Sequence, residues 1–190
     1  MSNKVFIAAT RQNDGKTMTS IGLFKAFLDR FETVGYIKPV GQQYRLIDGE
    51  KIDKDAVLFQ EVYQLKGSLK EMSPVAVPKG FTKKYVMDEN PEDLKPRIKA
   101  SFDALSQKNE FVLIEGTGHA GVGSVLDLSN AHVAKLLGAK VILVVPGGIG
   151  SCIDEVMMNK SLFDNLGVTI LGVIVNKVLP HKYDDVAQIG

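Results

Sequence analysis

The chain has 190 residues, a formal net charge of +1 and an ordinary globular composition, with 45% hydrophobic and 24% charged residues. This balance excludes a disordered chain, a collagen-like chain and a coiled coil. The near-zero charge argues against nucleic-acid binding, and the single cysteine, Cys152, excludes a disulfide framework. No apolar run approaches the roughly 20 residues that span a bilayer, and no signal peptide is expected because only five apolar residues stand in a row before Arg11. We therefore expect a cytoplasmic protein that binds neither membranes nor nucleic acids.

Short, continuous apolar runs predict strands that are buried on both faces of a parallel sheet. These strands are expected at residues 5–9, 33–37, 111–114, 141–145 and 170–175, with 33–37 the weakest. Amphipathic patterns between them predict helices at residues 16–31, 53–65, 91–105, 128–137 and 153–166, with Pro91 in the first turn of the third. This alternation predicts right-handed βαβ units and an α/β three-layer sandwich with a mostly parallel central sheet.

The remaining segments are expected to lie within one domain that spans residues 1–190. Residues 67–90 contain Pro74, Pro78 and Gly80, which indicate an irregular surface excursion and not a domain boundary. Residues 181–190 have the pattern of the first half of a helix, with no apolar run after it. Either the fold is minimal, or the chain is the front part of a longer polypeptide.

A phosphate-binding loop is predicted between the first strand and the first helix, in the run from Thr10 to Thr17. Gly15 allows close approach of the backbone, Lys16 reaches the β/γ-phosphates, and the Thr17 hydroxyl binds Mg²⁺. The usual pattern begins with glycine, and this chain has Thr10 there. The alternative is a plain strand-to-helix turn in which Thr17 only caps the helix. The expected nucleotide-binding residues of the loop are Asn13, Asp14, Gly15, Lys16, Thr17 and Met18.

Charged side chains stand at the carboxyl ends of two other predicted strands, where open α/β sheets bind ligands. Lys38 follows the second strand and Glu115 follows the third. We expect Lys16, Lys38 and Glu115 to be catalytic; the alternatives are a surface lysine and a solvent-facing edge carboxylate. Of Asp53 and Asp55, one is expected to cap a helix and the other to reach the metal.

Asn176 closes the last predicted strand and has the donor and acceptor needed to read a purine edge. Guanine recognition would add an aspartate where this chain has Leu179, so adenine is expected, with a simple turn role as the alternative. His119 is left open between a ligand contact and an exposed loop residue. Cys152 is expected to be structural because no histidine motif accompanies it.

In combination, six ordered motifs resemble the dethiobiotin synthetase branch of P-loop NTPases. That branch also includes cobyrinic acid a,c-diamide synthase and the amino-terminal domain of long phosphotransacetylases. The motifs are Thr10-x-x-x-x-Gly15-Lys16-Thr17, Lys38-Pro39, Asp53-Lys54-Asp55-Ala56, Glu115-Gly116-Thr117-Gly118, Gly150-Ser151-Cys152-Ile153 and Asn176. The resemblance implies ATP and Mg²⁺ as cofactors, with Thr17, Asp55 and Glu115 as metal ligands and Asn176 as the adenine contact.

The chain departs from this family at residues 10–14 and 116–124, the two loops that hold the diamino acid substrate in dethiobiotin synthetases. Nucleotide binding without diamino acid turnover is therefore expected. Arg11 stands where partition ATPases carry a lysine that reaches across a dimer, and its role is left open.

Two functions remain in competition. One is an ATP- and Mg²⁺-binding NTPase domain, acting as an ATPase or as a regulatory module that contacts a homodimer partner or a following domain. The other is an ATP-dependent ligase that activates a carbamate or carboxylate, with a small carboxylate or amine as second substrate.

Overall fold

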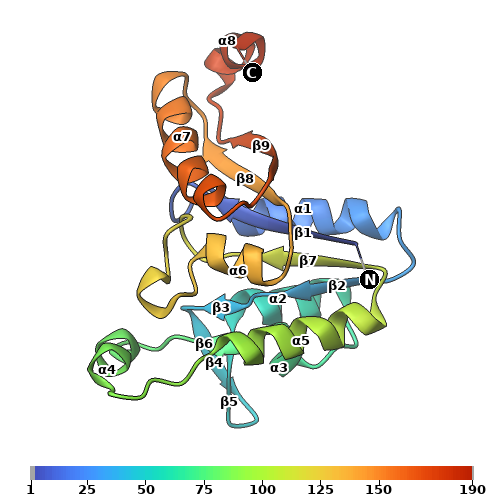
Figure 1. Cartoon of the computed structure of the whole chain (residues 1–190). Helices are drawn as coiled ribbons and strands as arrows, with labels where there is room; N and C mark the ends of the chain where they lie inside the picture. Colours follow the sequence, from blue (N-terminus) through green and yellow to red (C-terminus); the bar gives the residue numbers. More distant parts are fainter. Residues whose placement is uncertain (1–2, 190) are drawn as a thin grey trace.

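A five-stranded sheet forms the centre of the computed structural model, which describes residues 3–189 (Figure 1). Its strand order is β2-β7-β1-β8-β9, and every neighbouring pair is parallel. The strands are β1 (Asn3–Ala9), β2 (Val34–Ile37), β7 (Phe111–Glu115), β8 (Val141–Pro146) and β9 (Ile170–Asn176). All five strands predicted from apolar runs are thus confirmed. Every residue of β2 and β7 is buried, as continuous apolar strands between two helical layers require.

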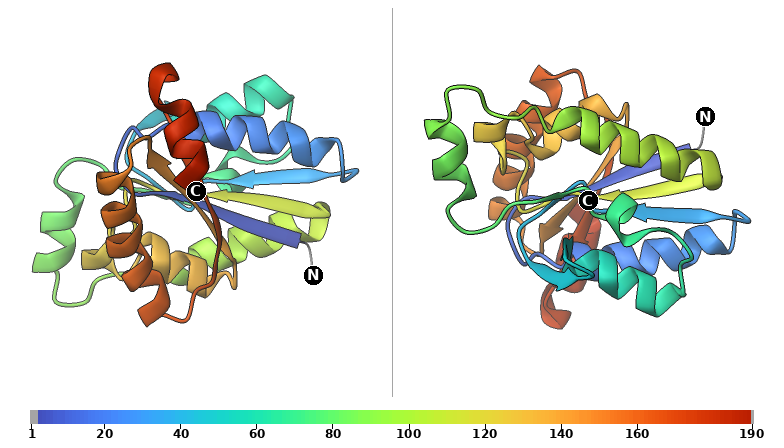
Figure 2. Two further views of the ribbon diagram at one scale, coloured as in Figure 1. Left: turned by 90° about the horizontal axis from the view of Figure 1, so that it is seen from above. Right: turned by 90° about the horizontal axis from the view of Figure 1, so that it is seen from below.

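Helices cover both faces of the sheet, which gives three layers (Figure 2). One face carries α1 (Lys16–Leu28) and α2 (Lys54–Tyr63), and the other carries α5 (Lys95–Lys108), α6 (Asn130–Leu136) and α7 (Gly150–Asn165). The predicted α/β sandwich with a parallel central sheet is confirmed. No helix within residues 3–189 has both the length and the apolar character to cross a bilayer.

Several predicted helix boundaries are wrong by a few residues. The first helix ends at Leu28, before Phe31, and the last large helix begins at Gly150, before Ile153. The helix predicted from Pro91 begins at Lys95, and Pro96 is the proline of its first turn. The Asp93 carboxylate accepts a hydrogen bond from the Lys95 backbone N–H, so the chain turns at Asp93 before the helix starts.

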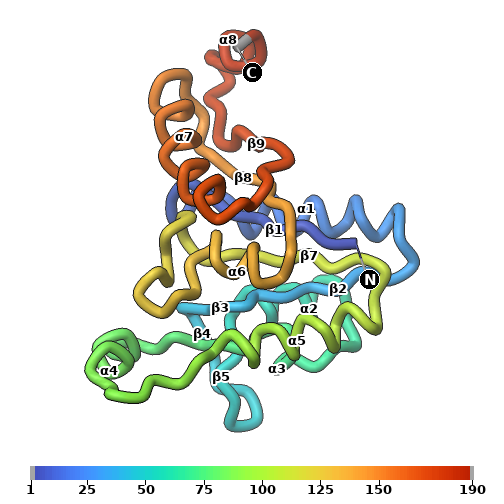
Figure 3. The backbone as a smooth tube through the Cα atoms, viewed as in Figure 1, coloured from blue at the N-terminus to red at the C-terminus, as the bar shows by residue number. Residues whose placement is uncertain are grey.

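The segment expected to be irregular, residues 67–90, contains three short elements: α3 (Leu69–Met72), β6 (Val75–Ala76) and α4 (Phe81–Met87). Strand β6 pairs with β3 (Val40–Gly41), and helix α4 lies away from the central sheet (Figure 3). A hairpin of β4 (Tyr44–Ile47) and β5 (Glu50–Asp53) was not expected from the sequence. Its turn residues, Asp48 and Gly49, have φ of 50° and 80°, as a tight hairpin turn requires.

The carboxyl-terminal residues form two short helical elements, η2 (Pro180–Lys182) and α8 (Tyr183–Ile189). The predicted helical tail is therefore confirmed as far as Ile189, and Gly190 lies outside the described residues. A further short turn, η1 (Ser124–Leu126), precedes α6.

An aromatic cluster fixes α1 and α2 against the sheet. The Phe24 ring of α1 lies 5.4 Å from that of Phe59 and 4.6 Å from that of Tyr63, centroid to centroid. Phe59 in turn stacks on Tyr36 of β2, with centroids 3.7 Å apart. The beginnings of both helices, where the candidate site residues lie, are thereby held relative to the strand ends.

Replacing Phe24 by alanine should lower the free energy of unfolding by about 3–5 kcal/mol, because a fully buried ring leaves a cavity between the two helices. Leu46→Ala, at a side chain that is 68% exposed, should change it by no more than about 0.5 kcal/mol. Urea denaturation followed by circular dichroism measures both values. Equal losses in the two variants would contradict this account of the core.

Candidate functional site

The carboxyl ends of the parallel strands bring the predicted site residues to one edge of the sheet. Thr10 follows β1, Lys38 follows β2, and Glu115 ends β7. The chain leaves β1 toward α1 on one face, whereas it leaves β7 toward α6 on the other (Figure 2). Ligands bind at such a switch point in open α/β sheets. A pocket of about 350 Å³ opens there, between the phosphate loop and a charged cluster that includes Lys38 and Asp55.

Contacts within the chain hold the phosphate loop in place. Gly15 has φ of 91°, and a Cβ atom there would collide with the Asn176 side chain, so only glycine fits. The Asn176 amide donates to the Asp14 backbone carbonyl across 2.8 Å. The Asp14 carboxylate is itself buried and accepts from the Thr10 hydroxyl at 3.0 Å and from the Arg11 N–H at 2.8 Å. Asn176 thus lies against the phosphate loop.

Lys16 lies in the wall of the pocket at the start of α1. Burial lowers its pKa, and the nearby Lys38 ammonium lowers it further. Among the contacts within residues 3–189, its ammonium makes neither an ion pair nor a hydrogen bond. The pocket therefore contains a cation that has no direct hydrogen-bond or ion-pair partner among the described residues, although the Glu115, Asp55 and Asp53 carboxylates attract it from a greater distance.

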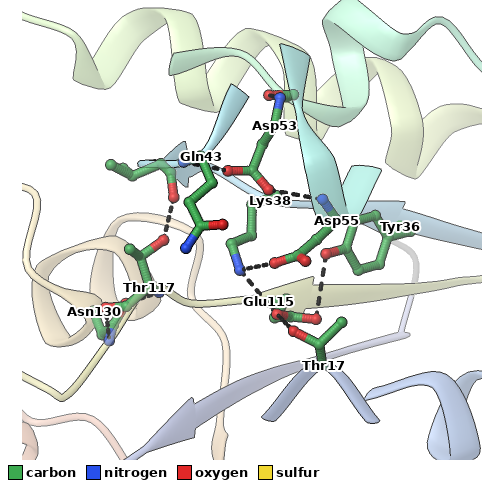
Figure 4. A network of polar contacts seen from close by, with 11 residues as sticks. Thr17, Tyr36, Lys38, Gln43, Asp53, Asp55, Glu115, Thr117 and Asn130 are labelled. Carbon is green, nitrogen blue, oxygen red and sulfur yellow. Dashed lines mark hydrogen bonds and ion pairs between the residues drawn. The ribbon is translucent and has the colours of Figure 1, made fainter. Parts of the chain in front are cut away.

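Two further predicted site residues, Thr17 and Asp55, contact the pair formed by the Lys38 ammonium and the Glu115 carboxylate (Figure 4). The Lys38 Nζ atom lies 2.8 Å from Glu115 Oε1 and 2.6 Å from Asp55 Oδ2. The Thr17 hydroxyl donates to the same Glu115 oxygen across 2.9 Å. Glu115 is completely buried, and the Lys38 side chain is only 5% exposed. The structure thus brings together Thr17, Lys38, Asp55 and Glu115 from four separate segments of the chain.

The charges in this cluster stabilise one another. Burial alone would lower the pKa of Lys38, but the Glu115 and Asp55 carboxylates outweigh burial and raise it. Burial alone would raise the pKa of Glu115, but the Lys38 and Lys16 ammonium groups outweigh burial and lower it. Both groups are therefore charged at neutral pH. The Tyr36 hydroxyl completes the cluster by donating to Glu115 Oε2 across 3.3 Å.

The two aspartates at the start of α2 have different contacts. The Asp53 carboxylate accepts from the Asp55 backbone N–H at 2.9 Å and so caps the helix. Its own backbone N–H donates to the Ser73 hydroxyl, which anchors the cap. Asp53 is therefore the capping aspartate, and the Asp55 carboxylate is left for the contact with Lys38.

Two asparagines that the sequence analysis missed shape the second glycine loop, residues 116–123. Asn130 of α6 accepts from the Thr117 N–H and donates to the Thr117 and His119 carbonyls. Asn159 of α7 accepts from the Ala120 N–H at 3.0 Å. Both are buried polar residues on helices, and the sequence carries no signal of that burial, because a polar residue on a helix is usually exposed.

The structure assigns structural contacts to two other residues that the sequence singled out. His119 is exposed, and its Nδ1 atom accepts from the Gly121 N–H, which folds the loop. Cys152 is buried, and burial together with the nearby Glu155 raises its thiol pKa. A raised pKa means an unreactive thiol, in agreement with the expected structural role.

Replacing Lys38 by methionine should cost about 3–5 kcal/mol of the free energy of unfolding, because Glu115 is then buried without its partner. The double variant Lys38→Met/Glu115→Gln should recover much of this loss, since the uncompensated charge is gone. Urea denaturation of the unmodified protein, the two single variants and the double variant measures the coupling. Strictly additive losses would show that the two side chains do not stabilise each other.

Acid should weaken the fold through Glu115. Because its folded-state pKa is lowered from the ordinary 4.5, its contribution is fully present above that value and is lost as pH falls through the folded pKa. The free energy of unfolding should therefore fall more steeply below pH 4.5 in the unmodified protein than in Glu115→Gln. Denaturant titrations at a series of acidic pH values measure both slopes. Parallel curves would refute the assignment.

The AAA domain family matches residues 3–190, almost the entire chain. An ATP-dependent dethiobiotin synthetase from Clostridium kluyveri is 27% identical over 192 residues, covering 97% of this chain and 79% of the relative. One from Methanococcus vannielii is 29% identical over 174 residues, covering 90% and 78%. A phosphate acetyltransferase from Synechocystis is 22% identical, covering 95% of this chain and 26% of the relative.

Solved structures with low sequence identity share the fold. The BceF tyrosine kinase domain superposes with a TM-score of 0.57 at 15% identity, covering 93% of this chain and 69% of that domain. A plasmid partition protein from Borrelia burgdorferi, bound to AMPPNP, gives 0.54 at 12% identity, covering 96% and 78%. The fold, the phosphate loop and the family match agree, and the resemblance to dethiobiotin synthetases is confirmed. The chain belongs to the AAA domain family, as a P-loop NTPase of the dethiobiotin synthetase-like type.

Proposed function

We propose that this chain binds ATP together with Mg²⁺ in the pocket at the strand ends and acts as an NTPase domain. The observation that carries the proposal is the Lys16 ammonium, which lines the pocket and makes no direct hydrogen bond or ion pair with the described residues. It lies at the beginning of a 13-residue helix, where backbone N–H groups and the helix dipole attract anions. A nucleotide phosphate would give this ammonium the direct partner that it lacks.

The residues at the pocket fit a nucleotide with its metal ion. The loop that includes Asn13, Asp14, Gly15 and Met18 would hold the phosphates through its backbone, with Lys16 on the terminal phosphates. Among residues 3–189, no three His, Cys, Asp or Glu side chains form a ready-made metal site. Mg²⁺ does not need one, because it is commonly held by one or two carboxylates, substrate phosphates and waters.

Thr17, Asp55 and Glu115 are the oxygen ligands that we propose for the metal ion. Their side chains already gather at one point, since Thr17 contacts Glu115 and both carboxylates contact Lys38. Mg²⁺ bound there would neutralise charge on the phosphate oxygens. Lys16 and Lys38 add fixed positive charge beside the phosphates, and such preorganised charge is the main catalytic contribution in phosphoryl transfer.

Asn176 is proposed to favour adenine over guanine. Its amide nitrogen donates to the Asp14 carbonyl, and no contact within residues 3–189 uses its side-chain oxygen, which could therefore accept from the amino group of adenine. The names of the dethiobiotin synthetase relatives, which are ATP-dependent, support the same choice. In a competition assay against a labelled ATP analogue, ATP should displace the probe at lower concentration than GTP, and the reverse order would refute the assignment.

One observation favours the ligase as a second candidate function. The pocket continues past the phosphate loop to Gln42, Gln43, Thr117 and Gly118, which leaves room for a small carboxylate or amine beside the phosphates. Because residues 10–14 and 116–124 depart from the dethiobiotin synthetase pattern, we expect no dethiobiotin from 7,8-diaminopelargonic acid, bicarbonate and ATP. Robust product formation that disappears in Lys16→Ala would place the ligase first.

In the regulatory form of the first candidate, the nucleotide controls contact with a homodimer partner or a following domain.

Replacing Lys16 by alanine should weaken MgATP binding at least tenfold and leave the circular dichroism spectrum unchanged, because only the free cation of the pocket is lost. Lys25→Ala is the matched control, since Lys25 lies on the same helix, is 62% exposed and pairs with Asp29. Titration calorimetry with MgATP measures both affinities. Equal affinity for MgATP in the two variants would contradict the proposed nucleotide site.

A further inference from the structure

We propose that Glu155 of α7 is a positioning residue that holds the phosphate loop in its ligand-binding conformation. The Glu155 side chain is 14% exposed and is not part of the pocket wall, so it would act on a nucleotide only through the loop. The expected effect of Glu155 on nucleotide binding rests on the proposed function. Its effect on the conformation of the phosphate loop does not depend on that function.

The contacts of Glu155 go to the first two residues of the loop. The Thr10 hydroxyl donates to Glu155 Oε2 across 2.8 Å, and the Arg11 guanidinium lies 3.0 Å from Glu155 Oε1. In the usual P-loop pattern the first position is glycine, which has no side chain to hold. Here Thr10 replaces that glycine, is only 4% exposed and provides the loop with an anchor point.

Two carboxylates share the Thr10 hydroxyl, which has a single proton to donate. The second carboxylate is that of Asp14, four residues further along the loop, whose Oδ2 atom lies 3.0 Å from the Thr10 hydroxyl. Arg11 compensates both acids, because its backbone N–H donates to Asp14 and its guanidinium pairs with Glu155. Thr10, Arg11, Asp14 and Glu155 thus form a network in which Glu155 anchors the beginning of the loop, whereas Asn176 and Lys177 hold its later residues through the backbone carbonyls of Asp14 and Asn13.

The same helix also holds the second glycine loop. The Asn159 amide donates to the Glu155 backbone carbonyl across 2.9 Å, and its oxygen accepts from the Ala120 N–H. One turn of α7 thus anchors two loops that border the pocket region. Thr10 and Glu155 are 145 residues apart in the sequence, so this connection exists only in the folded chain.

Glu155→Ala tests the inference, with Asp154→Ala as the matched control because Asp154 is an exposed acid next to it on the same helix. Hydrogen exchange should accelerate at the amides of residues 10–15 in Glu155→Ala, and the core strands should keep their protection. MgATP affinity should fall about tenfold or more in the same variant. The control should match the unmodified protein in both measurements.

Glu155→Gln separates the two contacts, because its amide oxygen still accepts from Thr10 while the ion pair with Arg11 is lost. It should restore much of the loop protection and of the affinity. Unchanged exchange at residues 10–15 and unchanged affinity in Glu155→Ala would overturn the inference. Acceleration spread equally over the core strands would overturn it as well, since it would indicate a general loss of stability. If the unmodified protein binds no MgATP while the loop still exchanges faster in Glu155→Ala, the anchoring role stands and the proposed function fails.

Discussion

The ammonium of Lys38 lies inside the protein between the carboxylates of Asp55 and Glu115, and the geometry of the site depends on this contact. A buried charge is costly unless it is paired and hydrogen-bonded. The end of β2, the end of β7 and the first turn of α2 must therefore stay together. Because Glu115 also accepts from Thr17, the start of α1 is held in the same arrangement.

The two lysines at this edge of the sheet, Lys16 and Lys38, differ in how directly carboxylates contact their ammonium groups. Lys38 is neutralised by carboxylates that raise its pKa, whereas burial lowers the pKa of Lys16, which lacks such contacts within the described residues. The first lysine serves to hold two acids in place. The second remains available for an anion at the beginning of a helix. This division explains how one small region can be stable without a ligand and still attract a polyanion.

The sequence was sufficient for the sheet and for the strand-end residues, because strands buried on both faces are visible as continuous apolar runs. Lys38 and Glu115 could be placed at the site since parallel strands end at the same edge. The ion pair between Lys38 and Glu115 could not be predicted, because it depends on which strands are neighbours in the sheet. Glu155 and Asn159 were missed because a polar residue on a helix is usually exposed, and their partners lie in distant loops. The 44–53 hairpin could have been found from Asp48-Gly49.

The most direct test of the account is the pKa of Lys16, measured by NMR on the labelled side-chain amine with and without MgATP. This pKa should lie below the ordinary 10.5 in the free protein, because burial and Lys38 disfavour the charged form. The pKa should rise when MgATP binds, because phosphate oxygens favour the charged form. An ordinary pKa in the free protein that does not change with MgATP would contradict the claim that the Lys16 ammonium binds the phosphates of the nucleotide.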